Sequence, residues 1–420
     1  MNRQDHNISN SGKRWMKHAR HFGAVASSDG PHAIASGLGS DSDFDTNSLT
    51  SEGLVALIRT SPREFLGLTD APLASRPVVL DGSPVDLSIW TLTSALTLSL
   101  VTGRPFQIHN FRASAPDPGL RLEELGLIKA AATLCEAKLE GNSAGSRRLS
   151  FRPSECLPRD LSIDLGTAGS ASLLIQTLHL PLALKARRAS RLTVLGGIFP
   201  GDGPRFAVLD ETWRGQMARV GAHVALAMPA MDKIEAWIEP AGLRPVNWTT
   251  RGRLLKLRGF VRPGNLGGEV AERLKGLVES RLRFEGFKAE IEIIAPEGTS
   301  SGTSIQLTAT HDDGVKGPGS ATFVAVVEPG TAPEKAANDT LEAFLRFERI
   351  ADAAIDPQSA GPLLLALALA EGRSEFTVSE VTRPLRATLE TLRAFLPDRV
   401  ITILEGEGGT SAARVAVSLK

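Results

Sequence analysis

From residue 77 onward, short runs of alternating apolar and polar residues are separated by longer helical stretches that are almost wholly apolar. Alternation with period two predicts half-buried strands, and a longer apolar stretch bounded by Gly or Pro predicts a buried helix. Gly103-Arg-Pro105 is such a boundary. The first stretch predicts, in chain order, a strand at 77–81, a helix at 91–102, a strand at 106–110, a helix at 121–140 and a strand at 148–152.

The same order of elements recurs twice more, in units of roughly 75–90 residues, and such self-similarity is strong evidence of repeated architecture. The second unit predicts strands at 161–165, 191–196, 223–228 and 233–239, with helices at 169–184 and 206–222. The third unit predicts helices at 361–370 and 385–395, with strands at 375–379, 400–405 and 412–419. We therefore expect a large α/β (α+β) domain built from three repeated α/β units.

A separate segment interrupts the third unit. We expect a small inserted α/β domain at 262–335, with a helix at 268–284 and strands at 289–294, 303–309 and 321–327. The strand expected at 253–261 is assigned to the main domain, which then spans 76–261 and 336–420. A helix at 333–350, with Pro333 at its first position, leads back into that domain.

The region before the repeats has a different character. Residues 1–47 are polar and rich in Ser, Asp, Gly and His, so we interpret them as a disordered extension. Residues 48–75 carry apolar residues at helical spacing and predict a short helical lead-in.

Composition narrows the class of protein. The chain has 420 residues, 42% of them hydrophobic, and 47 basic residues balance 47 acidic ones. A net charge of zero excludes binding to nucleic acid through overall charge, so any such binding needs a local patch. No apolar run is long enough to span a membrane. Two cysteines without metal-ligand spacing fit a reducing, cytoplasmic setting. Nothing here indicates an oligomeric state.

Two strand–turn–helix junctions are candidate anion sites, because free backbone N–H groups gather at a helix N-terminus. They are Asp81-Gly-Ser83 and the segment Gly166 to Ser170, which also contains Gly169. Ordinary turns are the alternative. Arg112 follows a strand end, where a guanidinium suits phosphate or forms a surface ion pair. Gln176 is a polar amide in an apolar helix, so it binds either a ligand or a neighbouring loop.

Three further features have a structural and a functional interpretation. His179 lies on the same apolar helix as Gln176 and is interpreted as a core histidine. His311-Asp-Asp313 is expected in a turn of the insert, where metal binding is the alternative. A basic cluster, interpreted as a solvated helix end or as a contact for a nucleic-acid backbone, contains Lys185, Arg187, Arg188 and Arg191.

These stretches, taken in order, resemble the RNA 3′-terminal phosphate cyclase family over about 76–420. The matching stretches are Val79-Leu-Asp-Gly-Ser83, Thr102-Gly-Arg-Pro-Phe-Gln-Ile-His-Asn-Phe-Arg112, Gly166-Thr-Ala-Gly-Ser170 with Gln176-Thr177, Gly196-Gly197 and Glu375-Phe-Thr-Val378. The resemblance implies the fold expected above, three repeated units with an insert.

The resemblance also implies a reaction. A histidine attacks the α-phosphorus of ATP, AMP then passes to a 3′-terminal RNA phosphate, and the 2′-hydroxyl displaces it to leave a 2′,3′-cyclic phosphate. ATP, a divalent metal and an RNA 3′ end are the implied cofactors and partner. The positions that match the family's binding residues are Asp86, Arg112, Gly166, Gly169, Ser170 and Gln176.

Other positions depart from the family pattern. The family's conserved glutamine falls on Trp90, its following arginine on Thr93 and its late aspartate on about Gly361. The nucleophilic histidine falls on Pro384, and no histidine follows His311. Proline has no nucleophile, so the covalent step through a histidine is lost at this position.

Three functions stay open. The first is RNA 3′-phosphate cyclisation, or a diverged nucleotidyl transfer on the same fold. The second is a non-catalytic relative that binds RNA or a nucleotide, or acts as a scaffold, in RNA processing. The third, compatible with a net charge of zero, is a plain protein-interaction module. We expect a retained fold and a lost cyclase reaction.

Overall fold

A computed structural model describes residues 76–84, 88–166, 169–197, 206–230, 232–263, 267–294, 303–312, 318–327, 330–404, 406 and 411–420. The expected extension at 1–47, the expected lead-in at 48–75 and the candidate residue Asp86 lie outside the described residues. The extension, the lead-in and the role of Asp86 therefore stay predictions.

The first unit is a four-stranded sheet with the order β1-β2-β4-β3. Its strands are β1 (Val78–Asp81), β2 (Phe106–His109), β3 (Lys138–Glu140) and β4 (Leu149–Arg152), with helices α4 (Ser88–Thr102) and α5 (Leu122–Cys135). β1 and β2 run parallel, and the other pairs are antiparallel. The helix predicted to reach residue 140 is too long, because Glu136 adopts a left-handed conformation (φ 49°) that ends α5, and β3 follows.

The second unit repeats this plan with the order β5-β6-β8-β7. Its strands are β5 (Leu161–Asp164), β6 (Ser190–Leu195), β7 (Val224–Ala230) and β8 (Lys233–Ile238). Helix α6 (Ala171–Lys185) joins β5 to β6. The segment predicted as one helix at 206–222 is α7 (Phe206–Val208), a π-helix η2 (Leu209–Trp213) and α8 (Arg214–Arg219).

The third unit has the order β15-β16-β14-β9, which is the same plan again. Its elements are β9 (Asn247–Trp248), α11 (Ala360–Leu369), β14 (Ser374–Val378), α12 (Arg383–Phe395), β15 (Arg399–Leu404) and β16 (Ala413–Leu419). In each unit the first strand pairs in parallel with the second, and a terminal hairpin completes the sheet. The mixed α/β fold class is therefore confirmed, and the three sheets share one strand order.

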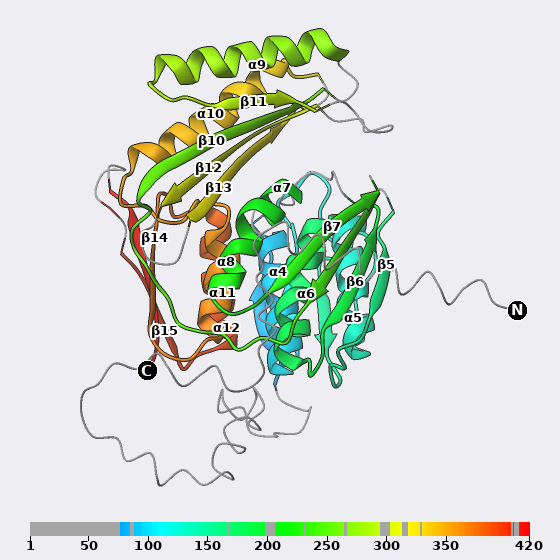
Figure 1. Ribbon diagram of the computed structural model, residues 1–420. Coiled ribbons are helices and arrows are strands. Elements are labelled where there is room, and N and C mark those ends of the chain that lie inside the picture. Colours follow the sequence, from blue (N-terminus) through cyan, green and yellow to red (C-terminus); the bar gives the residue numbers. More distant parts are fainter. Residues whose placement is uncertain are drawn as a thin grey trace, which may run out of the picture. The chain divides into compact units, whose positions relative to one another are not determined.

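The helices of the three units pack on one another inside a shared apolar core. α4 contacts α6 and α12, and α11 contacts α12, as Figure 1 shows. Nearly every residue of α4 is buried, which explains why its sequence lacks a polar face. None of the helices in the described part of the chain is both long and apolar enough to cross a membrane.

The insert forms a fourth sheet, with the order β11-β10-β12-β13, covered by two helices. Its elements are β10 (Arg253–Arg262), α9 (Gly267–Phe284), β11 (Glu290–Ile293), β12 (Ser304–Asp312), β13 (Pro318–Val326) and α10 (Pro333–Arg349). A second hydrophobic cluster runs from Leu257 to Ala353.

Two sequence assignments change here. The strand at 253–261, assigned from the sequence to the main domain, pairs with β11 and β12 of the insert, and in the third unit it is β9 that pairs in parallel with β14. His311 and Asp312 lie in β12, in place of the predicted turn, because the ladder with β13 extends to Asp312. The domain limits stay a prediction, and these pairings favour an insert of about 253 to 353.

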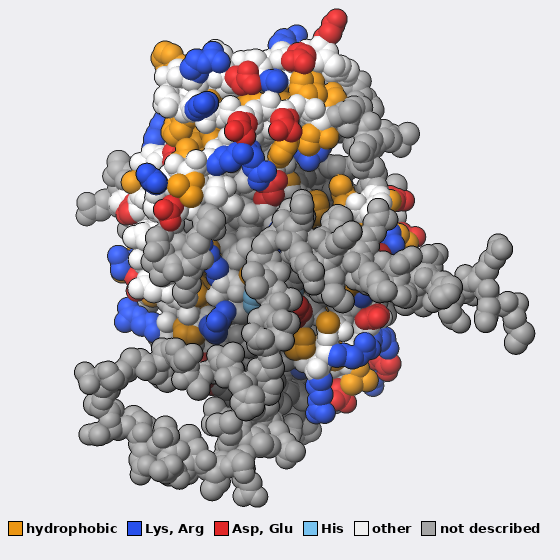
Figure 2. Space-filling view, in the orientation of Figure 1, with side chains coloured by type: hydrophobic (Ala, Val, Ile, Leu, Met, Phe, Trp, Pro, Cys, Tyr) orange, Lys and Arg blue, Asp and Glu red, His pale blue; other side chains and the backbone are white. Residues whose placement is uncertain are grey.

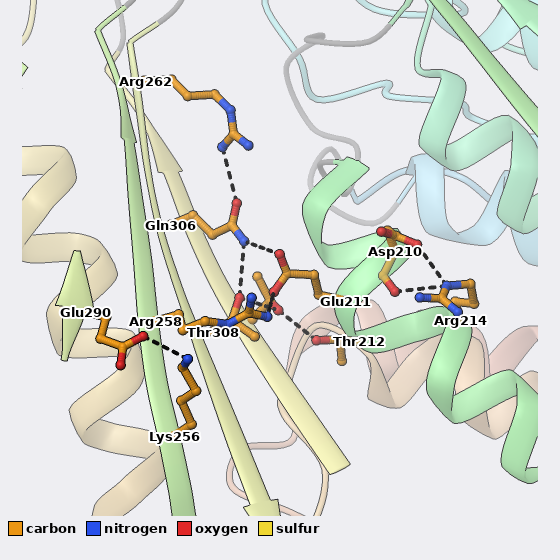
Figure 3. A network of polar contacts seen from close by, with 11 residues as sticks. Asp210, Glu211, Thr212, Arg214, Lys256, Arg258, Arg262, Glu290, Gln306 and Thr308 are labelled. Carbon is orange, nitrogen blue, oxygen red and sulfur yellow. Dashed lines mark hydrogen bonds and ion pairs between the residues drawn. The ribbon is translucent and has the colours of Figure 1, made fainter. Parts of the chain in front are cut away.

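The π-helix η2 contacts the inner face of the inserted sheet through polar groups, shown in Figure 3. Gln306 Nε2 donates to Glu211 Oε1 at 3.1 Å, and Arg258 Nη2 reaches Glu211 Oε2 at 3.5 Å. Thr212 Oγ1 donates to Thr322 Oγ1 at 2.9 Å. These bonds fix the insert against the second unit.

Candidate functional site

A pocket forms where helices of all three repeated units meet. Its lining residues come from α4, α6, the η2–α8 segment, α11 and α12, and they are Trp90, Thr93, Ser94, Thr97, Leu173, Gln176, Thr177, Leu180, Trp213, Met217, Gly361, Pro362, Leu365 and Thr388. Of the positions discussed from the sequence, the structure brings together Trp90, Thr93, Gln176 and Gly361. No charged side chain is among these described lining residues.

The hydroxyl groups in the pocket donate mostly to neighbouring backbone. Thr97 Oγ1 donates to the Thr177 carbonyl at 2.9 Å, which joins α4 to α6. Thr93 Oγ1 donates to the Ile89 carbonyl at 3.0 Å. Ser94 Oγ and Thr388 Oγ1 lie 3.3 Å apart and join α4 to α12. The hydroxyls therefore hold the helices together and leave mainly acceptor lone pairs for a ligand.

Gln176 differs from these hydroxyls. Its side chain makes no hydrogen bond to the part of the chain that the structure describes. It is half-buried, as are Trp90 and Pro362, whereas the other lining residues are buried, so these three residues mark the mouth of the pocket. A half-buried amide facing an apolar pocket without a partner favours the ligand interpretation of Gln176.

Trp213 and Met217 were not anticipated from the sequence. The 206–222 pattern indicated an ordinary helix, in which the π-helical register of η2 cannot be read. That register directs Glu211 and Thr212 to the insert while Trp213, 2% exposed, lines the pocket.

At each of the two candidate anion turns, one described backbone N–H group already donates to a carboxylate of the chain itself. Ser83 donates both its backbone N–H, at 3.2 Å, and its hydroxyl, at 2.6 Å, to the Asp81 carboxylate. These bonds, with Ser83 first among the causes, lower the pKa of Asp81. The Gly166 N–H donates to Asp164 Oδ1 at 2.8 Å. A phosphate at either turn would face a carboxylate, which opposes its binding.

The other turn residues have structural roles. Ser170 is buried and caps α6, because its Oγ accepts the Leu173 N–H at 3.2 Å. Gly169 is required by close packing, since a Cβ there would lie 2.8 Å from the Leu165 Cβ. Gly166 has a φ of 58°, which favours glycine.

Arg112 lies apart from the pocket lining. Its backbone N–H donates to the Gly82 carbonyl at 2.8 Å, which places it beside the first turn. The guanidinium is almost fully buried, and Nη2 binds Asp117 Oδ1 at 2.8 Å while Nη1 has no partner. An orphaned buried donor on a cation is costly, so Arg112 is a candidate anion ligand.

Position 384 lies in the first turn of α12. Thr382 caps this helix, and Pro384 occupies one of its first two positions. Thr388 follows four residues later on the same helical face and lines the pocket. Pro384, where the resemblance places the family's nucleophilic histidine, therefore lies one turn from the pocket.

No histidine lines the pocket among the described residues. His179 is fully buried in α6, and its ring packs edge-on against Trp213 with centroids 4.9 Å apart. Burial lowers the pKa of His179 to about 3, and the nearby backbone of His223 and Ala222 opposes that shift only in part. His179 is therefore a core residue, as interpreted, but neither of its ring nitrogens has a hydrogen-bond partner among the described residues.

The remaining candidates do not form a metal centre. The described residues contain no group of three or more His, Cys, Asp or Glu side chains able to hold a metal ion. His311 Nε2 is bonded to Glu348 Oε1 at 2.7 Å. Arg187, Arg188 and Arg191 are exposed beyond the C-terminal end of α6, away from the pocket half of that helix.

Comparison with known proteins identifies the relatives of this chain. The family model described as RNA 3′-terminal phosphate cyclase matches residues 90–401. An RNA 3′-terminal phosphate cyclase from Pyrobaculum neutrophilum is 32% identical over 329 residues, 76% of this chain and 93% of the relative. One from Pseudomonas fluorescens is 34% identical over 336 residues, 74% of this chain and 90% of the relative.

Among solved structures, an EPSP synthase from Acinetobacter baumannii aligns over 83% of this chain and 66% of its own, with 12% identity and a TM-score of 0.28, too low to carry any argument. The family match covers well over half of the chain, and the sequence relatives are aligned over nearly their whole length. The chain belongs to the RNA 3′-terminal phosphate cyclase family.

Proposed function

We propose that this chain has kept the cyclase fold, has lost the cyclase reaction, and acts as a non-catalytic RNA- or nucleotide-binding protein in RNA processing. The observation that carries the proposal is Pro384 at the position of the family's nucleophilic histidine. Proline cannot form a phosphoramidate, so the adenylyl group has no acceptor there.

Within the part of the chain that the structure describes, no imidazole takes the place of the lost histidine. His179 is enclosed and neutral, and its ring nitrogens have no route to solvent or to a bound nucleotide. His109 lies at the end of β2, beside Asp81 rather than in the pocket lining. The histidines before residue 76 lie outside the described residues.

ATP and a divalent metal, which the resemblance implies, do not fit the described residues. A triphosphate needs cations or free backbone N–H groups, and the described residues of the pocket lining supply no charge. Asp81 and Asp164 each accept one of the backbone N–H groups, those of Ser83 and Gly166, at the two turns.

An RNA contact is supported by Arg112 and by family membership. Arg112 keeps an orphaned buried Nη1 beside the Gly82 turn. The face of the molecule in Figure 2 shows cations and carboxylates interspersed rather than one broad basic field. An RNA ligand would therefore depend on local groups such as Arg112 rather than on overall charge.

The nucleophile claim is tested by incubating the purified full-length chain with α-labelled ATP and a divalent metal. The cyclase from Pyrobaculum neutrophilum serves as the positive control. We expect label on the control and none on this chain. Acid-labile, hydroxylamine-sensitive adenylate on this chain would overturn the proposal.

The RNA claim is tested with Arg112→Ala, and Arg121→Ala is its matched control. Both cations bind Asp117, Arg121 at 3.0 Å, but Arg121 is 45% exposed and on the surface. We expect Arg112→Ala to weaken binding of a 3′-phosphorylated oligoribonucleotide about tenfold and Arg121→Ala to have little effect. Equal affinities for the wild type and both variants would contradict a role for Arg112.

A further inference from the structure

The two cysteines of this chain lie next to each other in the first unit. Cys135 is the last residue of α5, and Cys156 lies in the irregular segment that leads from β4 to β5. Both are free thiols, both are buried, and both belong to the main hydrophobic core. Their spacing in the sequence indicated neither a metal site nor a disulfide framework, so it is the fold that brings them together.

The pairing of β3 with β4 sets the separation of the two backbones. These strands are antiparallel, and Lys138 lies opposite Arg152 at the end where β3 begins and β4 ends. The two segments stay together beyond this pair, because the Ser154 N–H donates to the Cys135 carbonyl at 3.1 Å. Ser154 Oγ also donates to the Glu136 carbonyl at 3.3 Å. Facing residues of antiparallel segments have Cα atoms roughly 4.5–5.5 Å apart, which is within the range that a disulfide spans.

A second attachment fixes the segment on the other side of Cys156. Arg159 Nη2 donates to the Thr133 carbonyl at 2.8 Å, in the last turn of α5. Cys156 is therefore held between two attachments to the end of α5, and its thiol forms a side-chain hydrogen bond with the thiol of Cys135. The two sulfur atoms already face each other in the reduced fold.

The two thiols differ in their access to solvent. Cys135 is fully enclosed, whereas Cys156 is 9% exposed and lies between two exposed residues, Glu155 and Leu157. The hydrogen bond with Cys156 is the first cause that raises the pKa of Cys135, and burial is the second. Cys135 therefore stays protonated and enclosed, which leaves Cys156 to react first with an oxidant from solution.

We infer that Cys135 and Cys156 form an intramolecular disulfide by exchange with a small disulfide, oxidised glutathione. Cys156 loses its proton to solvent, and its sulfur attacks one sulfur of oxidised glutathione, which releases the first glutathione as a thiolate. Cys135 then loses its proton to solvent and attacks the Cys156 sulfur, which releases the second glutathione. Two electrons pass from the two cysteines to the glutathione disulfide. The new bond fixes the segment between the first and second units to α5.

The test incubates the full-length chain with oxidised glutathione, blocks the remaining thiols with iodoacetamide and identifies the tryptic peptides by mass. We expect peptide 130–138 joined to peptide 149–159, which trypsin leaves whole because Pro153 follows Arg152. The oxidised chain should melt about 4 °C above the chain kept in dithiothreitol, because the bond closes a loop of the unfolded chain.

Single variants test the order of attack. Cys135→Ala should stop at a mixed disulfide between glutathione and Cys156, because no second thiol is left to release the glutathione. Cys156→Ala should leave Cys135 unmodified, since Cys135 is enclosed. Circular dichroism shows whether each variant folds, and the peptide map of the wild type decides the inference if one of them does not.

The opposite results are equally clear. Two free thiols after treatment of the wild type, glutathione retained on it, or a disulfide between two chains would overturn the inference. Glutathione on Cys135 in a folded Cys156→Ala variant would overturn the order of attack. An oxidised chain that melts no higher than the reduced one would contradict the fixing of the segment to α5. Neither cysteine is among the pocket-lining residues, so the adenylylation experiment tests the proposed function separately.

Discussion

A Cβ atom placed on Gly361 would lie 3.3 Å from Oγ1 of Thr388. That hydroxyl is 3.3 Å from Ser94 Oγ, so α11 approaches α12 at the same point where α12 is joined to α4. The resemblance places the family's late aspartate at about Gly361. The close approach of these helices therefore occupies the space that a carboxylate would need.

Restoring that carboxylate should destabilise the fold. Gly361→Asp places a charge in a buried, tightly packed position, and we expect the free energy of unfolding to fall by about 2 kcal/mol. Gly361→Ala is the control, because its helix propensity offsets the contact with Thr388, and it should change stability by less than about 1 kcal/mol. Urea unfolding followed by circular dichroism measures both. A Gly361→Asp variant as stable as the wild type would show that α11 and α12 can move apart to accept the carboxylate.

Returning a histidine to position 384 should not return the reaction. Pro384→His supplies a nucleophile one turn from Thr388, but Trp90 and Thr93 still offer nothing to a triphosphate. We expect no adenylate on Pro384→His under conditions that label the Pyrobaculum neutrophilum cyclase. Label on this variant would mean that proline is the single defect.

His179 should make stability fall in acid. Its folded pKa of about 3 lies below the ordinary value of 6.5, so the unfolded chain binds the proton first as the pH drops. Stability is lost between pH 6.5 and pH 3, by about 2 kcal/mol at pH 5. His179→Phe keeps a ring against Trp213 and should flatten this dependence in urea unfolding at pH 5 and 7.

The control for that experiment is His223→Gln, which changes an exposed histidine. It should keep the wild-type slope of stability against pH between 5 and 7. A steep slope that survives in His179→Phe would assign the effect to another group.

Asp356 predicts the opposite dependence on pH. It is fully buried, and desolvation raises its pKa despite hydrogen bonds from Ser359 and Gln358. A raised carboxyl pKa means that the folded chain holds the proton more tightly, so stability falls as the pH rises from 3.8 through the folded pKa. Asp356→Asn should remove this loss, because its Oδ1 still accepts both N–H groups.

The side-chain amide of Gln216 makes Asp356→Asn compatible with the fold. Gln216 Nε2 donates to Asp356 Oδ2 at 3.5 Å, and Gln216 Oε1 has no partner, so a flipped Gln216 amide can accept from the new Asn Nδ2. Asp356→Ala loses the acceptor of the Gln358 and Ser359 N–H groups before α11 and should cost about 1 kcal/mol at pH 7. Equal destabilisation by both variants would mean that the charge itself is required.

The repeated architecture could be predicted from sequence because apolar helices and alternating strands recur in one order. The elements predicted from sequence differ from the structure where strand pairing, rather than the pattern of apolar and polar residues, decides the fold. β9 has only two residues, Asn247 and Trp248, too few to show a period, and so β10 was assigned to its place. β3 was absorbed into a helix that Glu136 ends with a left-handed residue, a feature the pattern does not encode.

The candidate site was predictable in part. The resemblance grouped Trp90, Thr93, Gln176 and Gly361, and the structure places all of them around one pocket. The resemblance could not show that Arg112 lies outside the lining of this pocket. Nor could it show that Asp81 and Asp164 each accept one backbone N–H group at the glycine turns, because each bond depends on a strand end folding back onto its own turn.

The most direct experiment incubates a 3′-phosphorylated oligoribonucleotide with the purified full-length chain, ATP and Mg²⁺. Conversion of the 3′ end to a 2′,3′-cyclic phosphate is measured as resistance of that end to phosphatase. The account predicts that the end remains fully sensitive to phosphatase over many hours, while a cyclase from the same family protects it. Protection that scales with the concentration of this chain and requires ATP would contradict the claim that the reaction has been lost.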